Sequence, residues 1–351
     1  MKQPTTTKVC LPRATLCSLW LEIFLMLLLT FALASTIACA KGISSAGATV
    51  ATPKSEFPAA SPVPPESAAP DNAPLPHIDS KRAFQYTREV TAFGPRYMGS
   101  ENHKKLERYI LDHLKSDQVE DDTFTADTVE GKFPVRNIIA KFPGVKDGII
   151  VILGHYDTNY PLRDTGYVGA NDGGSSTAIL LEYANQLRGG GDGKKRDGYS
   201  VWLVWTDGEE AVKTWSATDS LYGSRHLAEK WEKDGTLQKI KALMVMDMIG
   251  DADLDIIRAT NGAPWLLDLI YTAAERGGYQ SHFYALQGSI EDDHVPFVKR
   301  GVPSADVIDL DYGYNNVFHH APQDTMDKLS PKSLEIVADT ILETIHILDQ
   351  R

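Results

Sequence analysis

Two adjacent glutamates, Glu209 and Glu210, follow an apolar run, YSVWLVW at residues 199–205, that predicts a buried strand. Neighbouring side chains of an extended or turning chain point in different directions. One carboxylate can therefore hold a metal ion while the other faces a substrate and transfers protons, because a nearby cation and partial burial adjust its pKa. Two exposed loop acids are the alternative interpretation of this pair.

Acidic and histidine side chains also follow three further apolar runs, GIIVILG (148–154), IKALMVM (240–246) and PSADVID (303–309). They are His155 and Asp157, then Asp172 in GANDGGSS, Asp247, and the pair His319-His320. Because ligand sites of open α/β sheets form beyond the carboxyl ends of the strands, we expect these groups to converge. Carboxylates with imidazoles form a ligand set that zinc commonly occupies, with room for one ion or two.

Each of these residues also has an ordinary structural interpretation. Asp172 before two glycines can be a turn residue or a helix cap, and His155 can be a buried histidine with satisfied hydrogen bonds. The placement of five such groups at one edge of one sheet favours a common site. Asp324, four residues after His320, is expected to orient that imidazole from behind.

The elements that position these residues alternate along the chain. Apolar positions at helical spacing predict helices over 176–187, 220–232, 263–276 and 331–348, between the apolar runs, and two helices around a Gly-Pro turn near residue 95. Two β-rich segments, VEDDTFTAD and VRNIIAKFP, predict strands before the first buried run. We therefore expect an α/β fold, a three-layer sandwich with a mixed, mainly parallel central sheet flanked by helices.

The N-terminal part of the chain predicts export. Residues 1–40 combine basic residues, the apolar run IFLMLLLTFALA and small residues, which is the form of a signal sequence or lipoprotein signal. Residues 41–77, rich in Ala, Pro and Ser, predict a disordered linker, and residues 78–351 a catalytic domain. We expect a periplasmic or extracellular protein, with a membrane tether if Cys39 is lipidated or the segment is retained.

Charge and cysteine content argue against nucleic-acid binding and against cysteine-based sites in the folded part. The net charge of −12, with no run of Lys and Arg, argues against a nucleic-acid partner. All three cysteines, Cys10, Cys17 and Cys39, precede residue 41. The folded part is therefore expected to have neither a disulfide nor a cysteine metal ligand.

The motifs as a set resemble a known superfamily. The stretches GHYDT, GANDGGSSTAILLE, DGEE and HHAPQDT are similar to those of zinc aminopeptidase-type exopeptidases, over roughly residues 80–350. Two stretches, EEAVKTWSATDSLYGSRHLAEK and EDDHVPFVKRGVP, resemble one branch, the glutaminyl-peptide cyclotransferases or glutaminyl cyclases, in a bacterial form. In that branch a longer segment containing a tryptophan separates the glutamate pair from the Gly-Ser.

The resemblance implies a reaction and a set of roles. The family cyclises N-terminal glutaminyl residues of peptides to pyroglutamate and releases ammonia, so peptides or proteins with N-terminal Gln are the expected partners. One zinc ion is expected, and the implied residues are Asp172, Glu210 and His320 as ligands, Glu209 as general base and acid, Asp247 and Asp292 as its carboxylate partners, and Trp215, His319 and Phe318 as substrate contacts. A second ion at His155 and Asp247 is an open alternative. A monomer is expected.

Two departures and two competing functions accompany this interpretation. His319 stands where the animal cyclases carry a tryptophan, and Asp306 where they carry a histidine. The first competing function is a two-metal zinc aminopeptidase, in which Asp172 bridges the ions and Glu209 activates a water; the insert with Trp215 favours the cyclase. The second is an inactive binding module, which the presence of Glu209 and every ligand disfavours.

Overall fold

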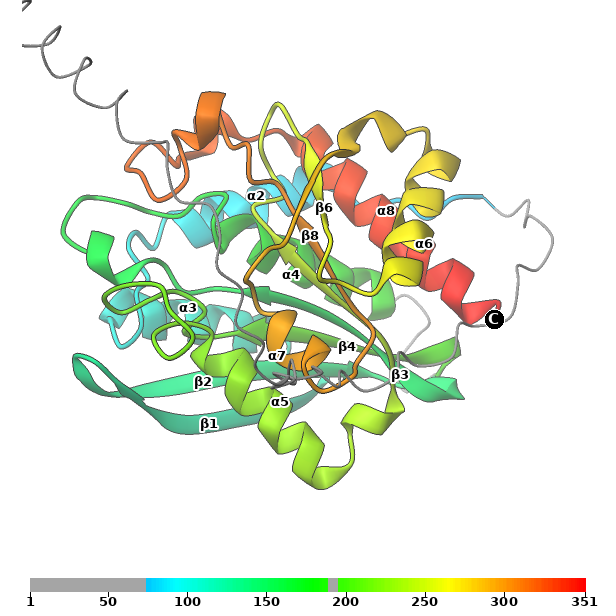
Figure 1. Ribbon diagram of the computed structural model, residues 1–351, viewed down its shortest axis with the longest axis horizontal. Helices are drawn as coiled ribbons and strands as arrows, with labels where there is room; N and C mark the ends of the chain where they lie inside the picture. Colours follow the sequence, from blue (N-terminus) through cyan, green and yellow to red (C-terminus); the bar gives the residue numbers. More distant parts are fainter. Residues whose placement is uncertain (1–73, 189–194) are drawn as a thin grey trace, which may run out of the picture. The chain divides into compact units, whose positions relative to one another are not determined.

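A computed structural model describes residues 74–188 and 195–351. Its centre is a six-stranded sheet in the order β1-β2-β4-β3-β5-β8 (Figure 1). The strands are β1 Gln118–Thr128, β2 Gly131–Phe142, β3 Gly144–His155, β4 Arg196–Thr206, β5 Ile240–Asp247 and β8 Ser304–Ile308. The pairs β4-β3, β3-β5 and β5-β8 are parallel, while β1-β2 and β2-β4 are antiparallel. The predicted mixed, mainly parallel sheet is thus confirmed.

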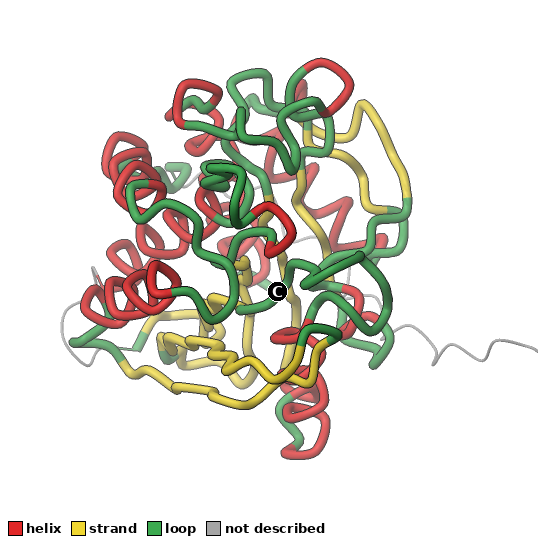
Figure 2. Tube along the Cα trace, turned by 90° about the vertical axis from the view of Figure 1, so that its left-hand side faces the viewer, coloured by secondary structure: helices red, strands yellow, loops and turns green. Residues whose placement is uncertain are grey.

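Helices cover both faces of this sheet (Figure 2). The α-helices are α2 Ser80–Thr91, α3 Glu101–His113, α4 Gly174–Arg188, α5 Tyr222–Asp234, α6 Pro264–Gly277, α7 Val295–Val298 and α8 Pro331–Asp349. Single 3-10 turns lie at Tyr160–Leu162, Leu237–Lys239, Gln280–His282, Tyr314–Asn316 and Met326–Lys328. Every predicted helix is present. The helix predicted from residue 220 begins at Tyr222, because Leu221 adopts a left-handed backbone with φ 53°.

Alternation along the buried strands divides the apolar core in two. In β3, Ile150 and Ile152 belong to a core that includes residues of α2, α3, α4, α6 and α8, whereas Val151 and Leu153 belong to a core with residues of α5 and α7. Successive side chains of a strand point to opposite faces, so an uninterrupted apolar run is what a sheet covered on both faces requires. This arrangement is the predicted three-layer sandwich.

Two short strands were not predicted. β6 (Ile256–Ala259) and β7 (Phe283–Gly288) pair in parallel as a separate two-stranded sheet. In β7 only Phe283 is buried, so the segment shows neither an apolar run nor a clear alternation. Such a strand forms because its partner is brought alongside by the tertiary fold, which sequence periodicity does not record.

The N-terminal predictions lie mostly outside the described residues. The signal segment 1–40 and the linker up to residue 73 are not described, and the domain boundary stays a prediction. The last residue of the predicted linker already contacts the domain: Nδ1 of His77 lies 2.6 Å from Oδ2 of Asp339, and the N–H of Ile78, which is buried, donates to Oδ1 of the same carboxylate at 2.9 Å. Within 74–188 and 195–351, none of the helices combines the length and apolar character needed to cross a bilayer.

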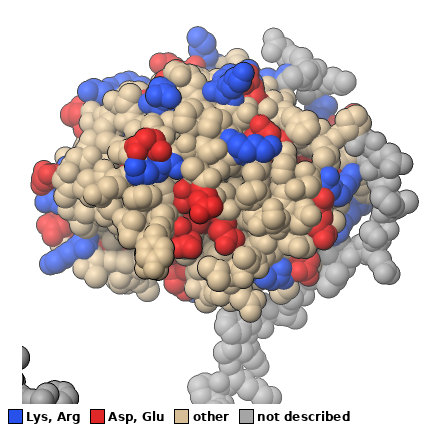
Figure 3. Space-filling model, turned by 90° about the horizontal axis from the view of Figure 1, so that it is seen from above, with Lys and Arg blue, Asp and Glu red and all other residues tan. Residues whose placement is uncertain are grey.

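Charge is unevenly distributed on the surface. On the face drawn in Figure 3, acidic side chains gather near the middle, and the lysines and arginines stand in separate groups around them. A nucleic-acid surface would instead present its basic side chains as a patch or stripe.

Candidate active site

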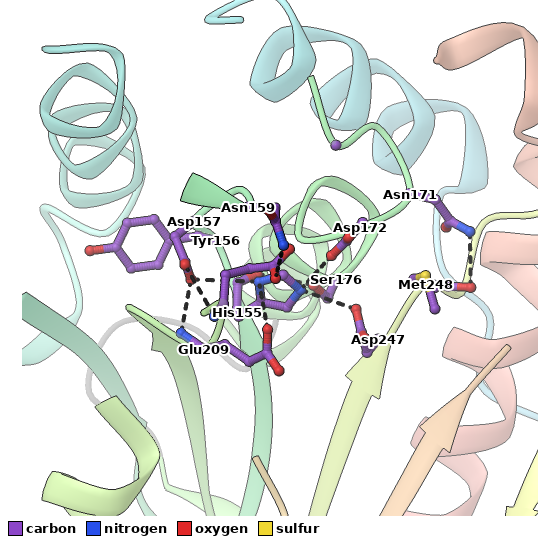
Figure 4. Close-up of polar contacts among 12 residues, drawn as sticks. His155, Tyr156, Asp157, Asn159, Asn171, Asp172, Ser176, Glu209, Asp247 and Met248 are labelled. Atoms are coloured by element: carbon purple, nitrogen blue, oxygen red, sulfur yellow. Dashed lines mark hydrogen bonds and ion pairs between the residues drawn. The ribbon is translucent and has the colours of Figure 1, made fainter. Parts of the chain in front are cut away.

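The ends of β3 and β5 bring a histidine and two acids together. Nε2 of His155, the last residue of β3, lies 3.1 Å from Oδ1 of Asp172 and 3.1 Å from Oδ1 of Asp247, the last residue of β5 (Figure 4). His155 is therefore not an isolated core histidine. These three residues form one group whose ligand atoms lie within 4.8 Å of one another, close enough to hold a metal ion.

The loop after β8 brings His320 to the same place. Its Nε2 lies 3.1 Å from Oε1 of Glu210 and 3.4 Å from Oδ2 of Asp172, so the three predicted ligands converge. His320 has φ 50°, a left-handed conformation that is strained for a residue with a side chain. Asp172, His319 and His320 also form a group within 4.8 Å, so both histidines of the pair lie within reach of one ion.

Asp157 fixes the glutamate pair that follows β4. Its carboxylate accepts hydrogen bonds from the N–H groups of Glu209 at 3.2 Å and Glu210 at 3.4 Å. Both glutamates are buried, which excludes the alternative of two exposed loop acids. Asn159, which sequence analysis did not select, donates from Nδ2 to Oε2 of Glu210 at 2.8 Å. Its position directly after the GHYDT motif was the available signal.

The loop before α4 directs the carboxylate of Asp172 into the site. Gly173 has φ 73°, and a Cβ there would lie 2.7 Å from the carbonyl oxygen of Asp157, so only glycine fits this turn. The Asp172 carboxylate contacts His155 and His320 and accepts a hydrogen bond from the hydroxyl of Tyr167. These contacts give Asp172 a role in the site rather than that of a helix cap.

The prediction that Asp324 orients His320 is wrong. Its carboxylate accepts hydrogen bonds from the N–H groups of Asn171 at 2.8 Å and Asp172 at 3.2 Å and from the hydroxyl of Tyr312 at 2.7 Å. Asp324 therefore holds the Asp172 loop in place instead of orienting His320. Sequence proximity to His320 was misleading because the chain turns back between the two residues, with Asp324 N–H donating to the Ala321 carbonyl.

The acids of the site attract positive charge. Burial by itself lowers the pKa of His155, yet the nearby carboxylate of Asp247 and the hydrogen bonds that the imidazole donates to neighbouring acids raise it well above the ordinary value. Burial likewise opposes protonation of His320, but the charge of Glu210 raises its pKa to about 9. A bound divalent ion would supply positive charge among these acids.

Glu209 lies in surroundings that favour its protonated form. Burial raises its pKa well above the usual range, and the charges of Glu210 and Asp292 raise it further, although His155 opposes them. Its Oε2 lies 3.9 Å from Nδ1 of His155. Burial also raises the pKa of Asp292 well above normal, with Asp247 as the next cause. Asp292 thus interacts electrostatically with both Glu209 and Asp247, the two acids with which it was predicted to act.

A further buried group lies behind these acids. Asp292, His294 and Asp306 place ligand atoms within 4.8 Å of one another, and all three are buried. Burial lowers the pKa of His294 to about 4, whereas burial and the charge of Asp292 raise that of Asp306. Asp306, noted as the replacement for a histidine of the animal enzymes, therefore extends the acid network by one carboxyl group.

A cavity of about 400 Å³ opens above the site. It is lined by eight of the nine predicted site residues, Asp172, Glu209, Glu210, Trp215, Asp247, Asp292, His319 and His320. The ninth, Phe318, is not brought to the cavity: its ring packs edge-on against Tyr312 at 5.4 Å, with Nζ of Lys328 5.2 Å from its centre. Apolar wall residues that sequence analysis missed are Met248, Ile290, Ile308 and Leu310.

The carboxylate of Asp219 organises the insert that carries Trp215, which is the segment 211–222 between the glutamate pair and Gly223. Asp219 accepts hydrogen bonds from the N–H groups of Val212, Lys213 and Thr214 at 2.9–3.0 Å and from the hydroxyl of Tyr222 at 2.8 Å. These bonds lower the pKa of Asp219 although burial opposes them. These hydrogen bonds hold the two ends of the insert together. Trp215, which is 40% exposed, lines the cavity.

We expect Asp219→Ala to loosen this insert, because three backbone N–H groups lose their acceptor. Hydrogen bonds to a charged group contribute about 1.5–3 kcal/mol each, so their loss should displace Trp215 and raise KM for the substrate roughly two- to tenfold, the range for loss of one aromatic contact. Trypsin cleavage after Lys213, followed by mass spectrometry, should become faster. Asp219→Asn keeps one acceptor oxygen and should be intermediate; unchanged cleavage in both variants would contradict this role.

Comparison with known proteins places the chain in a family. The sequence model of peptidase family M28 matches residues 137–345. A crystal structure of the glutaminyl cyclase of an Acidobacteriales bacterium matches with TM-score 0.77 and 48% identity, over 82% of this chain and all of that one. The glutaminyl-peptide cyclotransferase of Drosophila melanogaster is 31% identical over 62% of this chain and 68% of its own length. That of Bos taurus is 30% identical over 72% of this chain and 79% of its own length.

The match of the family model over most of the described α/β sandwich shows that the chain belongs to peptidase family M28. Within it, the relatives just described are glutaminyl cyclases, which confirms the branch that the Trp215 insert and the EDDHVPF stretch predicted.

Proposed function

We propose that the protein cyclises N-terminal glutaminyl residues of peptides to pyroglutamate and releases ammonia. The observation that carries this function is the cavity that Glu209 lines together with the acid–imidazole group and Trp215 of the insert. The glutaminyl cyclases among its relatives support the same reaction.

We propose that Asp172, Glu210 and His320 hold one zinc ion. Two carboxylates and one imidazole, with the imidazole nitrogen 3.1–3.4 Å from both acids, fit the mixed oxygen and nitrogen ligands of catalytic zinc, which keeps a position open for substrate. Asn159 and Tyr167 orient the two carboxylates through hydrogen bonds. When bound, the ion would polarise the γ-carbonyl of the substrate glutamine.

The chain's own residues supply proton transfer and positioning. As the substrate's α-amine forms a bond to the side-chain amide carbon, Glu209 accepts a proton from that amine; as the carbon–nitrogen bond of the amide breaks, Glu209 returns a proton to the departing ammonia. Attack within one residue gains from proximity. The raised pKa of Glu209 suits a group that must hold a proton between these steps, and Asp247 and Asp292 lie in the same electrostatic network.

The product of a Gln-initiated peptide tests the function. Incubation with the purified, zinc-loaded protein should yield a peptide that has lost the mass of one ammonia and its reactive N-terminal amine. Release of free glutamine and a shortened peptide would show hydrolysis instead. An Ala-initiated peptide of otherwise identical sequence is the control, because it cannot cyclise but remains a substrate for an aminopeptidase.

A two-metal aminopeptidase is the second candidate. It is favoured by one observation, the group of His155, Asp172 and Asp247, which can hold a further ion next to the first. In that case Asp172 would belong to the ligand groups of both ions, and Glu209 would act on a water molecule. Zinc content per chain after dialysis distinguishes one ion from two independently of turnover.

Trp215→Ala should raise KM for Gln-initiated peptides without loss of metal. An aromatic contact contributes about 0.5–1.5 kcal/mol, so a roughly two- to tenfold rise is expected. Trp215→Phe should retain most of the affinity, because the aromatic face persists. Unchanged kinetics in the alanine variant would remove Trp215 from the substrate site.

We further propose that the protein acts after export, in the periplasm or outside the cell, as a monomer with a membrane tether if its N-terminal segment is lipidated or retained. The support is the sequence of residues 1–40 and the linker that follows. Labelling with a radioactive fatty acid, compared between the wild type and Cys39→Ala, tests the lipid anchor.

A further inference from the structure

A second, larger groove of about 840 Å³ adjoins the catalytic cavity. Its walls come from β1, the insert, the start of α5 and the segment around α7. Trp215 and Glu291 line both the groove and the catalytic cavity. The two spaces are therefore neighbours that meet at this pair of residues, and a chain whose end occupies the cavity can continue into the groove.

One wall of the groove is an unpaired sheet edge. Residues 124–127 of β1 line it, and β1 stands at the end of the strand order with β2 as its neighbour. An edge strand presents backbone N–H and C=O groups that lack a partner strand. Extended peptides bind to such edges through main-chain hydrogen bonds, which need no particular peptide sequence. This wall suits an extended peptide.

Several charged side chains of the groove are already engaged by neighbours. The guanidinium of Arg225 donates to the carbonyl oxygens of Ser220 and Leu221, and that of Arg300 pairs with Glu232 at 3.1 Å. Glu229 pairs with Lys233, and Asp127 pairs with Lys132.

Lys299 and Glu291, both exposed, remain available. Within the described residues neither of them makes an ion pair or a side-chain hydrogen bond. Glu291 stands at the boundary with the catalytic cavity, whereas Lys299 follows the last residue of α7, Val298. A peptide that leaves the cavity thus passes an acid first and a free ammonium group further on.

We propose that this groove binds the part of the substrate peptide that follows its N-terminal glutamine, and that Lys299 selects an acidic side chain in that part. The inference rests on the proposed cyclisation. Lys299 lines the groove but not the cavity, so the side chain that reaches it belongs to the part of the peptide that has left the cavity, which advances about 3.3 Å per residue when extended. Glu291 disfavours an acidic residue directly after the glutamine. The preference for an acidic side chain is therefore expected only further along the peptide, where Lys299 can reach it.

Kinetics with two lengths of substrate test the inference. Wild-type protein is assayed with a Gln-initiated dipeptide amide, which ends before the groove, and with hexapeptides that carry a single Glu or a single Lys at each position from two to six. We expect KM to be lower for hexapeptides than for the dipeptide. We also expect one position beyond the second to favour Glu over Lys by roughly two- to fivefold, the range of an exposed ion pair, with the preference lost at high salt.

Charge reversal identifies the residue responsible. Lys299→Glu should invert the preference at that position and leave the dipeptide kinetics unchanged. Lys115→Glu, an exposed lysine that lines neither space, makes the same change in net charge and should behave as the wild type. Equal effects of Lys299→Glu on dipeptide and hexapeptides, or no effect on either, would overturn the inference. Failure of the wild type to cyclise even the dipeptide would instead overturn the proposed function and the inference with it.

Discussion

Replacement of Glu209 by glutamine is expected to lower kcat for cyclisation by about 10²- to 10⁴-fold, the usual contribution of general acid–base catalysis. Glutamine keeps the shape of the side chain but neither accepts nor returns a proton at neutral pH. The zinc content should stay that of the wild type, because the proposed ligands are Asp172, Glu210 and His320. The hydrogen bond that residue 209 donates to the Asp157 carboxylate comes from its backbone N–H and is kept in the variant.

Three measurements separate the roles of Glu209. Single-turnover kinetics report the chemical step, elemental analysis reports the metal, and KM for a Gln-initiated peptide reports binding. Glu130→Gln, in the exposed turn between β1 and β2, is the matched control. Full activity in Glu209→Gln would refute proton transfer by this residue, and loss of zinc would reassign it to the metal site.

Replacement of His320 by alanine is expected to remove the metal and, with it, turnover. Loss of a group that only orients a ligand already costs 10- to 100-fold in metal affinity, so loss of a ligand should cost about 100-fold or more. Zinc titration of the metal-free protein with a competing chelator measures this directly, without an activity assay. Excess zinc should restore part of the turnover in proportion to the zinc bound.

His319→Ala provides the matched comparison, because the two histidines are adjacent and both come within reach of Asp172. We expect this variant to retain the metal and to show a higher KM, as a wall of the cavity has been changed. Metal loss in His319→Ala together with retention in His320→Ala would shift the ligand assignment by one residue. Metal loss in both variants would indicate two imidazole ligands.

The sequence by itself determined the elements of the central sandwich and eight of the residues that line the cavity. Buried strands such as 148–154 are uninterrupted apolar runs because helices cover both faces of the sheet, and that pattern is local. The residues after each run were predicted to converge because parallel strands end at the same edge, a rule that needs no side-chain coordinates. Asp172, Glu209, Glu210, Asp247 and His320 could therefore be selected before the structure was known.

Only the tertiary structure decided which side chains face which neighbours. Asp324 was predicted to contact His320, but the loop returns and places its carboxylate under Asn171 and Asp172. Phe318 lies two residues from the proposed ligand His320 yet packs on Tyr312 and does not line the cavity, since neighbouring side chains of a loop have no fixed direction. Sequence spacing fixes direction only in helices and strands, where the backbone repeats.

The groove beside the cavity likewise could not be predicted from sequence spacing. Its walls come from β1, the insert and α7, and the uncommitted charge of Lys299 becomes visible only once the partners of the other charged residues are known. Periodicity identifies each of these elements alone. Their meeting depends on the packing of distant segments around one core. The groove beside the catalytic cavity therefore exists only in the folded structure.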